Sequence, residues 1–532
     1  MKFDLLIRGG YIIDGTGNPW FRGDVGVLEG RIEAIGDLSK CGASEEINAK
    51  GLTVTPGFID MHGHSDFCIL LNPYGESKIF QGVTTEVVGN CGDSAAPMDE
   101  KLKAYRERYM RKLLGPEFKF NWTTMGDYID RVNERGASLN IVPLVGHGTV
   151  RSIVVGFEDR KPAEDELREM CRLVEESMAD GAWGLSTGLI YTPGCFADTD
   201  EIVALAKVAA RYHGIYSSHI RGEGETLLDA VREAVEIGRR AGIPVEISHF
   251  KAHGRRSWGK TEESLKLVEE ARRDGIDVTF DQYPYTASST GLAALLPAWV
   301  REGGNDEMLK RLQDPKVRKR IKMDPEVLGR EWDRILLVYA EKHPDFSGKS
   351  IEELVKESGK ETLDFIFDLL IEEEAAVSIV AFEMCEEDVR RVMKSPYMMV
   401  GTDGRAISPK GILGRGKPHP RFYGTFPKIL GRYVREKRVL TLQEAVRKMT
   451  SMPAQKLGLR NRGLLREGMV ADIVIFDADE IIDEATFTDP HRFPRGIHYV
   501  IVRGEVVVRK NEHTGALPGR ALRKADDVYS AP

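Results

Sequence analysis

The sequence of 532 residues lacks any apolar run long enough to span a membrane. Its first residues, MKFDLLIRGGYIIDG, also lack the shape of a signal peptide, because apolar residues alternate with polar ones and no small-residue cleavage site follows. These absences argue against the membrane and secretory classes. With 42% hydrophobic and 30% charged residues, the composition is that of an ordinary globular protein, for which we predict a cytoplasmic location.

The sequence also has few cysteines and no blocks of charge of one sign. Its six cysteines show no repeating spacing, which argues against a disulfide framework in a chain of this size. The net charge of −8 arises from intermixed acidic and basic residues, which argues against a nucleic-acid partner. The expected partner is therefore a small molecule, and the composition predicts no particular oligomeric state.

Both ends of the chain are rich in short β-strand patterns. Residues 4–51 alternate in short runs that glycine and asparagine punctuate, which is typical of hairpins. This segment is too short to bury a core alone, and the runs 463–477 and 499–510 have the same character. We predict that residues 1–55 and 456–532 together form a small composite β-sandwich domain with a C-terminal tail.

Between these ends, strand-like runs alternate with amphipathic helical stretches, so the predicted class is α/β. There are eight such runs: the one that ends at His62-Gly63-His64, then 84–90, 139–148, 182–190, 214–220, 244–250, 276–284 and 398–404. Eight strands alternating with helices are the signature of a TIM-like (β/α)₈ barrel. We predict this barrel over residues 56–455.

One interval is too long for a barrel loop. About 110 residues separate the run 276–284 from 398–404, and they are highly charged and mostly helical by pattern. We predict an inserted helical subdomain at about 290–375, a candidate lid. The interval also holds VSIVAF (377–382), which competes with 276–284 for the seventh barrel strand, and the sequence leaves that choice open.

The stretch 56–66, PGFIDMHGHSD, places two histidines at the end of the first buried strand. Residues at i and i+2 of a strand point to the same side, so the imidazoles of His62 and His64 can face one ion. Two histidines in a polar loop are the ordinary alternative for an isolated H-x-H pattern. Further residues of metal-ligand type downstream favour the metal site.

Residues with imidazole, thiolate or carboxylate groups end five of the eight predicted strands. They are His62 and His64 on the first, Cys91 on the second, His219 on the fifth, His249 on the sixth and Asp403 on the eighth. In a parallel barrel all these ends meet on one face. This mixture of nitrogen, sulfur and oxygen donors suits zinc, so the six residues predict a zinc site.

Several longer motifs carry a resemblance to a known family. They are PGFIDMHGHSD, GVTTEVVGNCG, SSHIRGEG, EISHFKAHG, DQYPYTASST, VGTDG and PHPRFYGTFPKIL, and they extend over residues 56–430. The chain resembles the amidohydrolase superfamily and, within it, the N-acyl-D-amino-acid deacylases, or D-aminoacylases. GNCG and PHPR-x-x-GTF are specific to that branch, whereas the H-x-H pattern is shared across the superfamily.

The resemblance assigns roles to the candidate ligands. It implies that Cys91, His219 and His249 hold a tightly bound zinc, while His62 and His64 form a weaker second position that Cys91 bridges. Many relatives bridge two metals with a carboxylated lysine on the fourth strand, but this strand reads GAWGLSTGL and has no lysine. Occupancy of the second position is left open.

The resemblance also implies the residues that act on the substrate. Asp403 would be the general base and then the general acid, although a T-D-G turn alone is ordinary. Arg421 in PHPR would clamp the substrate α-carboxylate, with Tyr283 as a hydroxyl partner, Lys251 as a third group and Ser289 lining the pocket. His147 and His253 lie near strand ends and are interpreted as supporting or unrelated residues.

These expectations combine into zinc-dependent hydrolysis of the amide bond of N-acyl-D-amino acids, giving a carboxylate and a free D-amino acid. A metal-bound water would be the nucleophile. The alternatives are a hydantoinase-like or dipeptidase-like amidohydrolase acting on a cyclic amide or small dipeptide, and a barrel that has lost its metal and serves as a scaffold. The preferred side chain is not predicted. Its determinants are expected in 290–395 and in the GRRSWGK loop, 254–260.

Overall fold

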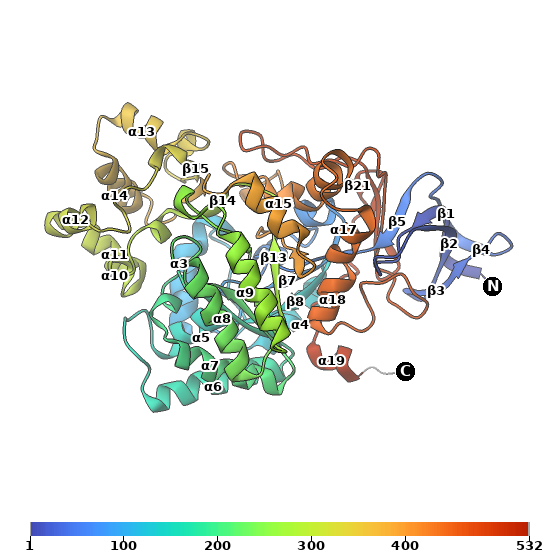
Figure 1. Cartoon of the computed structure of the whole chain (residues 1–532), viewed down its shortest axis with the longest axis horizontal. Helices are drawn as coiled ribbons and strands as arrows, with labels where there is room; N and C mark the ends of the chain where they lie inside the picture. The colour runs from blue at the N-terminus through green and yellow to red at the C-terminus, as the bar shows by residue number, and fades with distance from the viewer. Residues whose placement is uncertain (1, 530–532) are drawn as a thin grey trace.

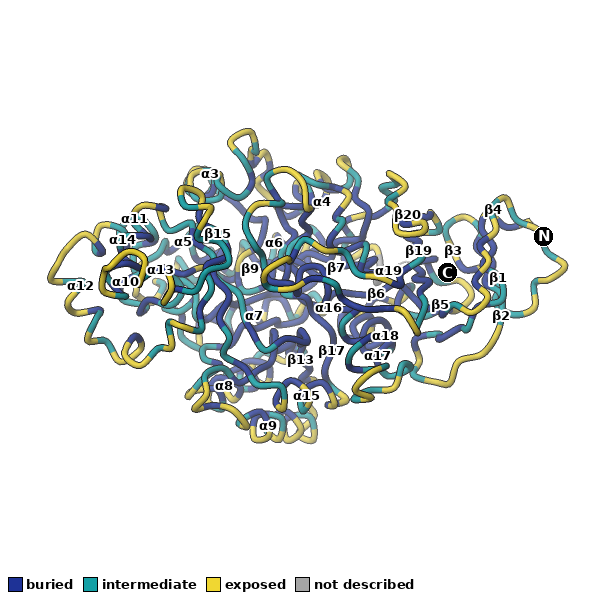
Figure 2. The backbone as a smooth tube through the Cα atoms, turned by 90° about the horizontal axis from the view of Figure 1, so that it is seen from above, coloured by how far each residue is buried: buried dark blue, intermediate teal, exposed yellow. Residues whose placement is uncertain are grey.

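The computed structural model describes residues 2–529 of the chain. Three parts follow one another along the long axis: a β-sheet that contains the N-terminal strands, a barrel in the middle, and a helical insertion at the opposite end (Figure 1). Viewed from above, the buried backbone is concentrated in the barrel between the two ends (Figure 2). The largest apolar core likewise joins the barrel strands to the helices around them.

Eight parallel strands form the barrel. They are β6 (Phe58–Asp60), β7 (Val83–Val88), β8 (Asn140–Pro143) with its continuation β9 (Val145–Gly146), β10 (Gly184–Gly188), β11 (Ile215–His219), β12 (Val245–Ile247), β13 (Val278–Gln282) and β17 (Met398–Val400). The first and last strands meet where Gly63 pairs with Gly404 and where the amide of Met61 donates to the carbonyl of Val400. The predicted α/β barrel is therefore confirmed.

The structure decides which run is the seventh strand. β13 pairs with β12 on one side and with β17 on the other, so it occupies that position. The competing run becomes β16 (Ser378–Ala381) and pairs antiparallel with β14 (Ser288–Gly291) and β15 (Ile335–Tyr339). Those three strands belong to the insertion.

Helices cover the outside of the barrel and follow its strands. The longer ones are α3 (Glu100–Leu114), α4 (Met125–Arg135), α6 (Glu164–Ala179), α7 (Thr199–Arg211), α8 (Leu227–Ala241), α9 (Thr261–Arg273) and α15 (Glu386–Lys394). Shorter ones are α1 (Cys68–Leu71), α2 (Glu76–Ile79), α5 (His147–Val154), α16 (Arg421–Lys428), α17 (Leu442–Met449) and α18 (Ser451–Leu457). Figure 1 shows α6 to α9 side by side on one flank. Gly242 ends α8 in a left-handed conformation, with φ of 65°, which glycine adopts without strain.

The two ends of the chain build one nine-stranded sheet. It contains β1 (Lys2–Ile12), β2 (Phe21–Leu28), β3 (Arg31–Gly36), β4 (Gly42–Asn48), β5 (Thr53–Pro56), β18 (Ile473–Phe476), β19 (Ile497–Val502), β20 (Glu505–Arg509) and β21 (Glu512–His513). A bridge between Arg31 and Val470 brings β3 back to the segment before β18, so the sheet curls around its own apolar core. The predicted composite β-sandwich is formed by this curled sheet.

The insertion has a hydrophobic core of its own. Around strands β14 to β16 it contains α10 (Ala298–Arg301), α11 (Gly304–Gln313), α12 (Pro315–Lys322), α13 (Ile351–Ser358) and α14 (Thr362–Glu372). Figure 1 shows these helices as a separate lobe beside the barrel. The predicted domain boundaries at 55/56 and 455/456, and the insertion limits of 290–375, remain predictions.

The C-terminal tail packs against the barrel. The amide of Leu522 donates to the carbonyl of Ile141 on β8, and the indole of Trp183 donates to the carbonyl of Leu522 at 2.8 Å. The short helix α19 (Lys524–Tyr529) follows. Among residues 2–529, no helix combines the length and the apolar character that a membrane crossing requires.

Candidate metal centre and active site

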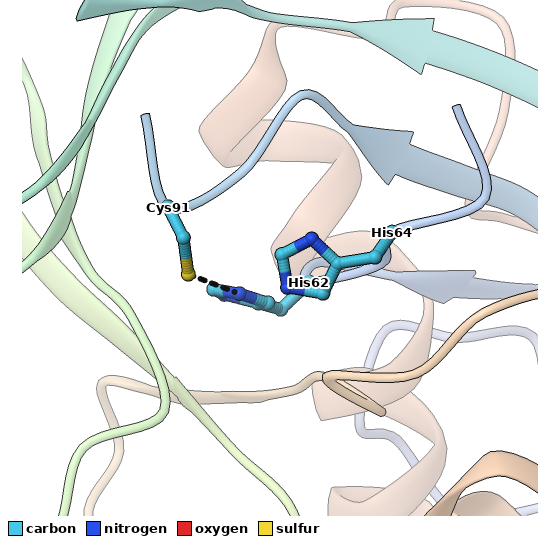
Figure 3. Close-up of side chains that lie close together, drawn as sticks. All are labelled: His62, His64 and Cys91. Carbon is cyan, nitrogen blue, oxygen red and sulfur yellow. Dashed lines mark hydrogen bonds between the residues drawn. The ribbon is translucent and has the colours of Figure 1, made fainter. Parts of the chain in front are cut away.

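The site is built around the thiol of Cys91 at the end of β7. Three imidazole nitrogens surround its sulfur: Nε2 of His62 at 3.4 Å, Nδ1 of His219 at 3.5 Å and Nε2 of His249 at 3.7 Å. The histidines come from the ends of β6, β11 and β12, as the parallel barrel requires. Figure 3 shows Cys91 facing His62 with His64 beside it. We call these five residues the Cys91 cluster.

Asp403, three residues beyond β17, extends the Cys91 cluster. Its Oδ1 lies 3.1 Å from Nε2 of His64 and 3.8 Å from Nε2 of His62. Its other oxygen, Oδ2, lies 3.0 Å from Nη2 of Arg421, at the start of α16. The structure therefore brings together all six residues that the sequence marked as metal ligands, and it places the proposed carboxylate clamp against one of them.

Three residues of this site leave their strands with left-handed backbone. The φ angles are 54° at Cys91, 36° at His249 and 48° at Asp403. Side chains other than glycine rarely adopt this region, and each such residue costs on the order of 1–3 kcal/mol. Conformations of this kind cluster at functional sites, where the surrounding structure holds them. Here they turn a thiol, an imidazole and a carboxylate toward one point.

Two carboxylates that sequence reasoning missed orient the histidines. Asp281 lies 3.2 Å from Nδ1 of His62 and also accepts the backbone amide of His249 at 2.9 Å. Glu223 lies 2.9 Å from Nδ1 of His249. Such partners fix which ring nitrogen faces a metal. Both residues stand in quoted motifs, Glu223 in SSHIRGEG and Asp281 in DQYPYTASST, but nothing local distinguishes them from other acids.

Charge within the Cys91 cluster is strongly polarised. Burial opposes ionisation of Cys91, but the nearby His62 outweighs it and holds the pKa of the thiol well below its usual value. Burial likewise opposes a charge on His62, yet Asp281 and Cys91 raise its pKa well above the ordinary range. Burial would raise the pKa of Asp403, whereas Arg421 holds it well below. At neutral pH the site therefore contains a thiolate and a carboxylate.

The donor set fits zinc. Zinc–sulfur and zinc–nitrogen bonds of about 2.3 and 2.05 Å at a tetrahedral angle separate sulfur from nitrogen by roughly 3.6 Å. The sulfur–nitrogen distances of 3.4–3.7 Å around Cys91 match that spacing. Cys91 groups with His219 and His249, and also with His62 and His64, closely enough for each set to hold one ion. The buried Nε2 of His219 has no hydrogen-bond partner among the described residues, while Nδ1 of the same ring faces the thiol of Cys91. Both implied metal positions therefore have suitable ligands.

A cavity of about 490 Å³ opens beside the Cys91 cluster. Cys91, Asp403, Arg421 and Ser289 line it, and Ser289 belongs to the insertion, which therefore contributes to the wall. Ser289 donates its hydroxyl to the carbonyl of Ile379, so its side chain is engaged in the insertion sheet.

Tyr283 and Lys251 lie behind the cavity wall and line a smaller, separate pocket. The guanidinium of Arg421 stacks over the ring of Tyr283 at 4.6 Å, and the Tyr283 hydroxyl is buried with no partner. Lys251 donates to Glu223 at 2.5 Å and lies 2.8 Å from Nδ1 of His249. The hydroxyl of Tyr283 is therefore without a hydrogen-bond partner among the described residues, whereas Lys251 contacts and supports His249.

The other two histidines noted in the sequence make no contact with the thiol of Cys91. His147 lies 2.8 Å from Glu201, which also pairs with Arg151 inside the barrel wall. The amide of His253 donates to the carbonyl of Glu223 at 2.8 Å. His147 belongs to a separate buried ion-pair group, and His253 supports the loop that carries Glu223.

Comparison with known proteins identifies relatives along the whole chain. The model of the amidohydrolase family matches residues 45–508. The chain is 36% identical to a D-aminoacylase from Alcaligenes xylosoxydans xylosoxydans, over 98% of each chain, and 36% identical to an N-acyl-D-glutamate deacylase of the same organism, over 100% of this chain and 99% of the relative. A crystal structure of N-acyl-D-glutamate deacylase from Bordetella bronchiseptica, complexed with zinc and a phosphonate mimic of the tetrahedral intermediate, superposes with a TM-score of 0.84. That structure is 35% identical and covers 98% of this chain and 100% of its own.

Proposed function

The chain belongs to the amidohydrolase family, and we propose that it hydrolyses the amide bond of N-acyl-D-amino acids to a carboxylate and a free D-amino acid. The observation that carries this proposal is the juxtaposition of the Cys91 cluster with the Asp403–Arg421 pair at 3.0 Å. It combines ligands for zinc, a carboxylate for proton transfer and a cation for a substrate carboxylate in one cavity. A cyclic amide has no free carboxylate for Arg421 to bind, so the hydantoinase-like alternative gives this cation no substrate partner, whereas a dipeptide would still offer one.

Cys91, His219 and His249 would hold the zinc, with His62 and His64 as the second position. Zinc bound there supplies a Lewis acid that polarises the scissile carbonyl and lowers the pKa of water toward neutrality. The chain orients these ligands through Asp281 and Glu223, which fix the imidazole rings from behind.

Asp403 carries the proton. Its Oδ1 faces His62 and His64, while its Oδ2 is held by Arg421, so one oxygen is aimed into the reaction site. Because its pKa lies well below the ordinary value, the group is a carboxylate at neutral pH and can accept a proton from water. The same oxygen then returns the proton to the nitrogen of the leaving amine.

Arg421 is the clamp for the substrate α-carboxylate. Its side chain is buried, and two of its guanidinium nitrogens, Nε and Nη1, have no hydrogen-bond partner among the described residues. The buried hydroxyl of Tyr283 beside it is also unpartnered. A carboxylate entering from the cavity would meet the guanidinium of Arg421, which lines it, and unsatisfied buried donors cost about 1–3 kcal/mol each. Fixing the α-carboxylate and the carbonyl together orients the Cα substituent, which is how D and L forms are distinguished.

The test is steady-state hydrolysis of N-acetyl-D- and N-acetyl-L-amino acid pairs of methionine, leucine, phenylalanine and glutamate by zinc-loaded protein. Turnover of D forms alone is expected, with kcat reduced about a thousandfold or more in Asp403→Asn. Asp229→Asn, an exposed carboxylate on α8, is the matched control and should keep full activity. Turnover of hydantoins or dipeptides without turnover of any acetylated amino acid would contradict the proposal. The cytoplasmic location stays a prediction of the sequence.

A further inference from the structure

The acidic side chains of the active-site cavity are Asp66, Asp93 and Asp403. Three arginines line it, Arg106, Arg405 and Arg421. Arg421 pairs with Asp403 at 3.0 Å, and Arg106 pairs with Asp93 at 2.5 Å. The guanidinium of Arg405 has no hydrogen bond or ion pair to any residue in the part of the chain that the structure describes. Of the three arginines in this cavity, Arg405 is therefore the one without an ion-pair partner in the described chain, although Asp66 also lines the wall.

The backbone of Arg405 is fixed. Its carbonyl accepts the hydroxyl of Ser77 at 3.0 Å, and the next amide, of Ala406, donates to the hydroxyl of Ser65 at 2.7 Å. The preceding residue, Gly404, takes part in the bridge that closes the barrel. Arg405 follows Asp403 by two residues, so its Cα is held in a constant relation to the catalytic carboxylate.

The surroundings of Arg405 strengthen attraction to an anion. The same cavity is lined by Phe67, Cys68, Leu113 and Leu114. Arg405 itself is half-buried, so its charge is less screened than in bulk solvent and attracts a carboxylate more strongly. No carboxylate oxygen of this chain lies within ion-pair distance of Arg405 to compete for that role, as far as residues 2–529 are concerned.

We propose that Arg405 binds a second carboxylate of the substrate, so that the enzyme prefers N-acyl-D-amino acids that carry an acidic group besides the α-carboxylate. This inference rests on the proposed deacylase function. Two sources offer the same chemistry: an acidic D side chain and a dicarboxylic acyl group. Arg421 takes the α-carboxylate, and Arg405 pairs with the other one.

The test compares kcat/KM for N-acetyl-D-leucine, N-acetyl-D-glutamate and N-succinyl-D-leucine. In the wild type, at least one diacid should exceed N-acetyl-D-leucine by tenfold or more, and the better diacid identifies the source of the carboxylate. Arg405→Met should abolish that preference while changing turnover of N-acetyl-D-leucine less than threefold. Arg405→Lys should retain part of it. Arg415→Met, an exposed arginine paired with Glu341, is the matched control.

Equal loss on all three substrates in Arg405→Met, with unchanged zinc content and circular dichroism, would overturn the role of Arg405. A diacid preference that survives Arg405→Met would also overturn it, as would a wild type with no such preference. Failure of the deacylase function itself looks different, because the wild type would then turn over none of the three substrates.

A second cavity, of about 470 Å³, lies where the curled sheet meets the C-terminal tail. It shares no lining residue with the active-site cavity. Its walls contain five arginines and two acids: Arg31, Arg462, Arg503, Arg520, Arg523, Glu29 and Asp526. Such a concentration of cations is unexpected in a chain whose net charge is −8.

The five arginines of this cavity differ in their ion pairing. Arg462 pairs with the buried Asp472 at 3.0 Å and Arg523 with Asp130 at 2.6 Å. The other three arginines form no ion pair within the described chain. Burial lowers the pKa of Arg503, the charges of Arg462, Arg520 and Arg31 lower it further, and Asp472 opposes the shift.

One buried hydrogen-bond donor of this cavity, Nε of Arg462, has no acceptor among the described residues. Arg462 is 5% exposed, and its Nε has no hydrogen-bond partner among residues 2–529. Oδ1 of the adjacent Asn461 is likewise unpartnered. Unsatisfied buried polar atoms in a native protein point to a missing partner.

The geometry points to this cavity as a binding site for a small anion that carries phosphoryl groups. Planar guanidinium groups match phosphoryl oxygens with paired hydrogen bonds, and several of them are needed to neutralise more than one negative charge. A ligand here would join the curled sheet to the tail, far along the chain from the Cys91 cluster.

Isothermal titration with tripolyphosphate at constant ionic strength tests the site. One site per chain is expected, with affinity reduced at least tenfold in the double variant Arg503→Ser/Arg520→Ser. The control is Arg168→Ser/Arg232→Ser, two exposed arginines on α6 and α8, which should bind as the wild type does. Undetectable binding by the wild type, or equal binding by both double variants, would overturn the site.

Discussion

Two buried polar clusters lie side by side in the barrel, and they differ in where their positive charge comes from. In one, Nζ of Lys78 donates to Asp60 at 2.7 Å, to Thr402 at 2.6 Å and to the carbonyl of Gly404 at 3.0 Å, with Glu86 at 3.1 Å. We call this the Lys78 cluster. The chain itself supplies the cation that contacts both carboxylates, although Oε2 of Glu86 has no hydrogen-bond partner among the described residues.

The Cys91 cluster is different because it has donors arranged for a cation that the chain does not supply. Its thiolate faces imidazoles that we propose as metal ligands, among them Nδ1 of His219 at 3.5 Å. The two clusters are connected, since Oδ1 of Asp60 accepts the backbone amides of His62 and Thr402. Asp60 of the Lys78 cluster thus holds the backbone of His62 in the Cys91 cluster. We expect the Lys78 cluster to stabilise the fold and the Cys91 cluster to bind metal.

The largest expected effect follows from removing the thiol at the centre of the Cys91 cluster. Cys91→Ala should lower kcat/KM on the order of a thousandfold and reduce bound zinc, because the thiolate belongs to both metal positions. Tm of the metal-free protein should change little, since the cluster gives little stability without its cation. Zinc content and thermal unfolding after chelation measure the two effects. Full zinc content in Cys91→Ala would refute the assignment of the ligand.

The opposite pattern, lower stability with zinc binding retained, is expected when the cation of the Lys78 cluster is removed. Lys78→Met leaves the carboxylates of Asp60 and Glu86 buried without a cation, which should lower the free energy of unfolding by about 3–5 kcal/mol. The protein that remains folded should still bind zinc. Urea unfolding measures the loss.

The triple variant Lys78→Met/Asp60→Asn/Glu86→Gln separates charge from packing, because it removes the unpaired charges as well. It should recover part of the stability that Lys78→Met loses. A Lys78→Met protein of wild-type stability would show that the Lys78 cluster does not hold this part of the barrel.

A smaller effect is expected at the contact between the metal site and the substrate. Arg421→Met should lower kcat/KM for N-acetyl-D-methionine by roughly tenfold to a hundredfold, the value of one or two hydrogen bonds to a charged group. The wild type should discriminate against N-acetyl-D-methionine amide, which lacks the carboxylate, and the variant should not. Arg432→Met, a partly exposed arginine near Asp483, is the control. If Arg421→Met still discriminates between N-acetyl-D-methionine and its amide as the wild type does, Arg421 is not the residue that binds the α-carboxylate.

The sequence predicted the barrel because its hydrophobic pattern is local, and it left the seventh strand open because VSIVAF has the same pattern as a barrel strand. Only the strand pairing identifies the seventh barrel strand. β13 pairs with β12 and β17 in the barrel, whereas β16 pairs with β14 and β15 in the insertion. These partners lie up to 118 residues away along the chain, as Phe280 and Met398 do, which no local pattern reveals.

The candidate ligands were visible in the sequence because histidine and cysteine are uncommon and stand at strand ends. Glu223, Asp281 and Lys78 were not, because acids and lysines are frequent everywhere and their roles depend on distant partners. Lys78, for example, contacts Thr402, which lies 324 residues away along the chain. Arg405 was passed over for the same reason: a missing partner is recognised only when all possible neighbours are in place.

A pH-dependent effect is expected for Glu246 on β12, a carboxylate that forms no ion pair in the described chain. Burial raises its pKa well above the ordinary value, and the nearby charge of Asp281 raises it further. The folded protein therefore holds this group neutral, while the unfolded chain ionises it near pH 4.5. Its contribution to stability is full below that pH and is lost as the pH rises through the folded pKa, by about 1.4 kcal/mol for each unit of difference. Glu246→Gln should then leave Tm unchanged at pH 4.5 and raise it at pH 8. Equal Tm values at both pH values would show that Glu246 is ionised in the folded protein and that an unseen cation balances it, as Lys78 balances its own carboxylates.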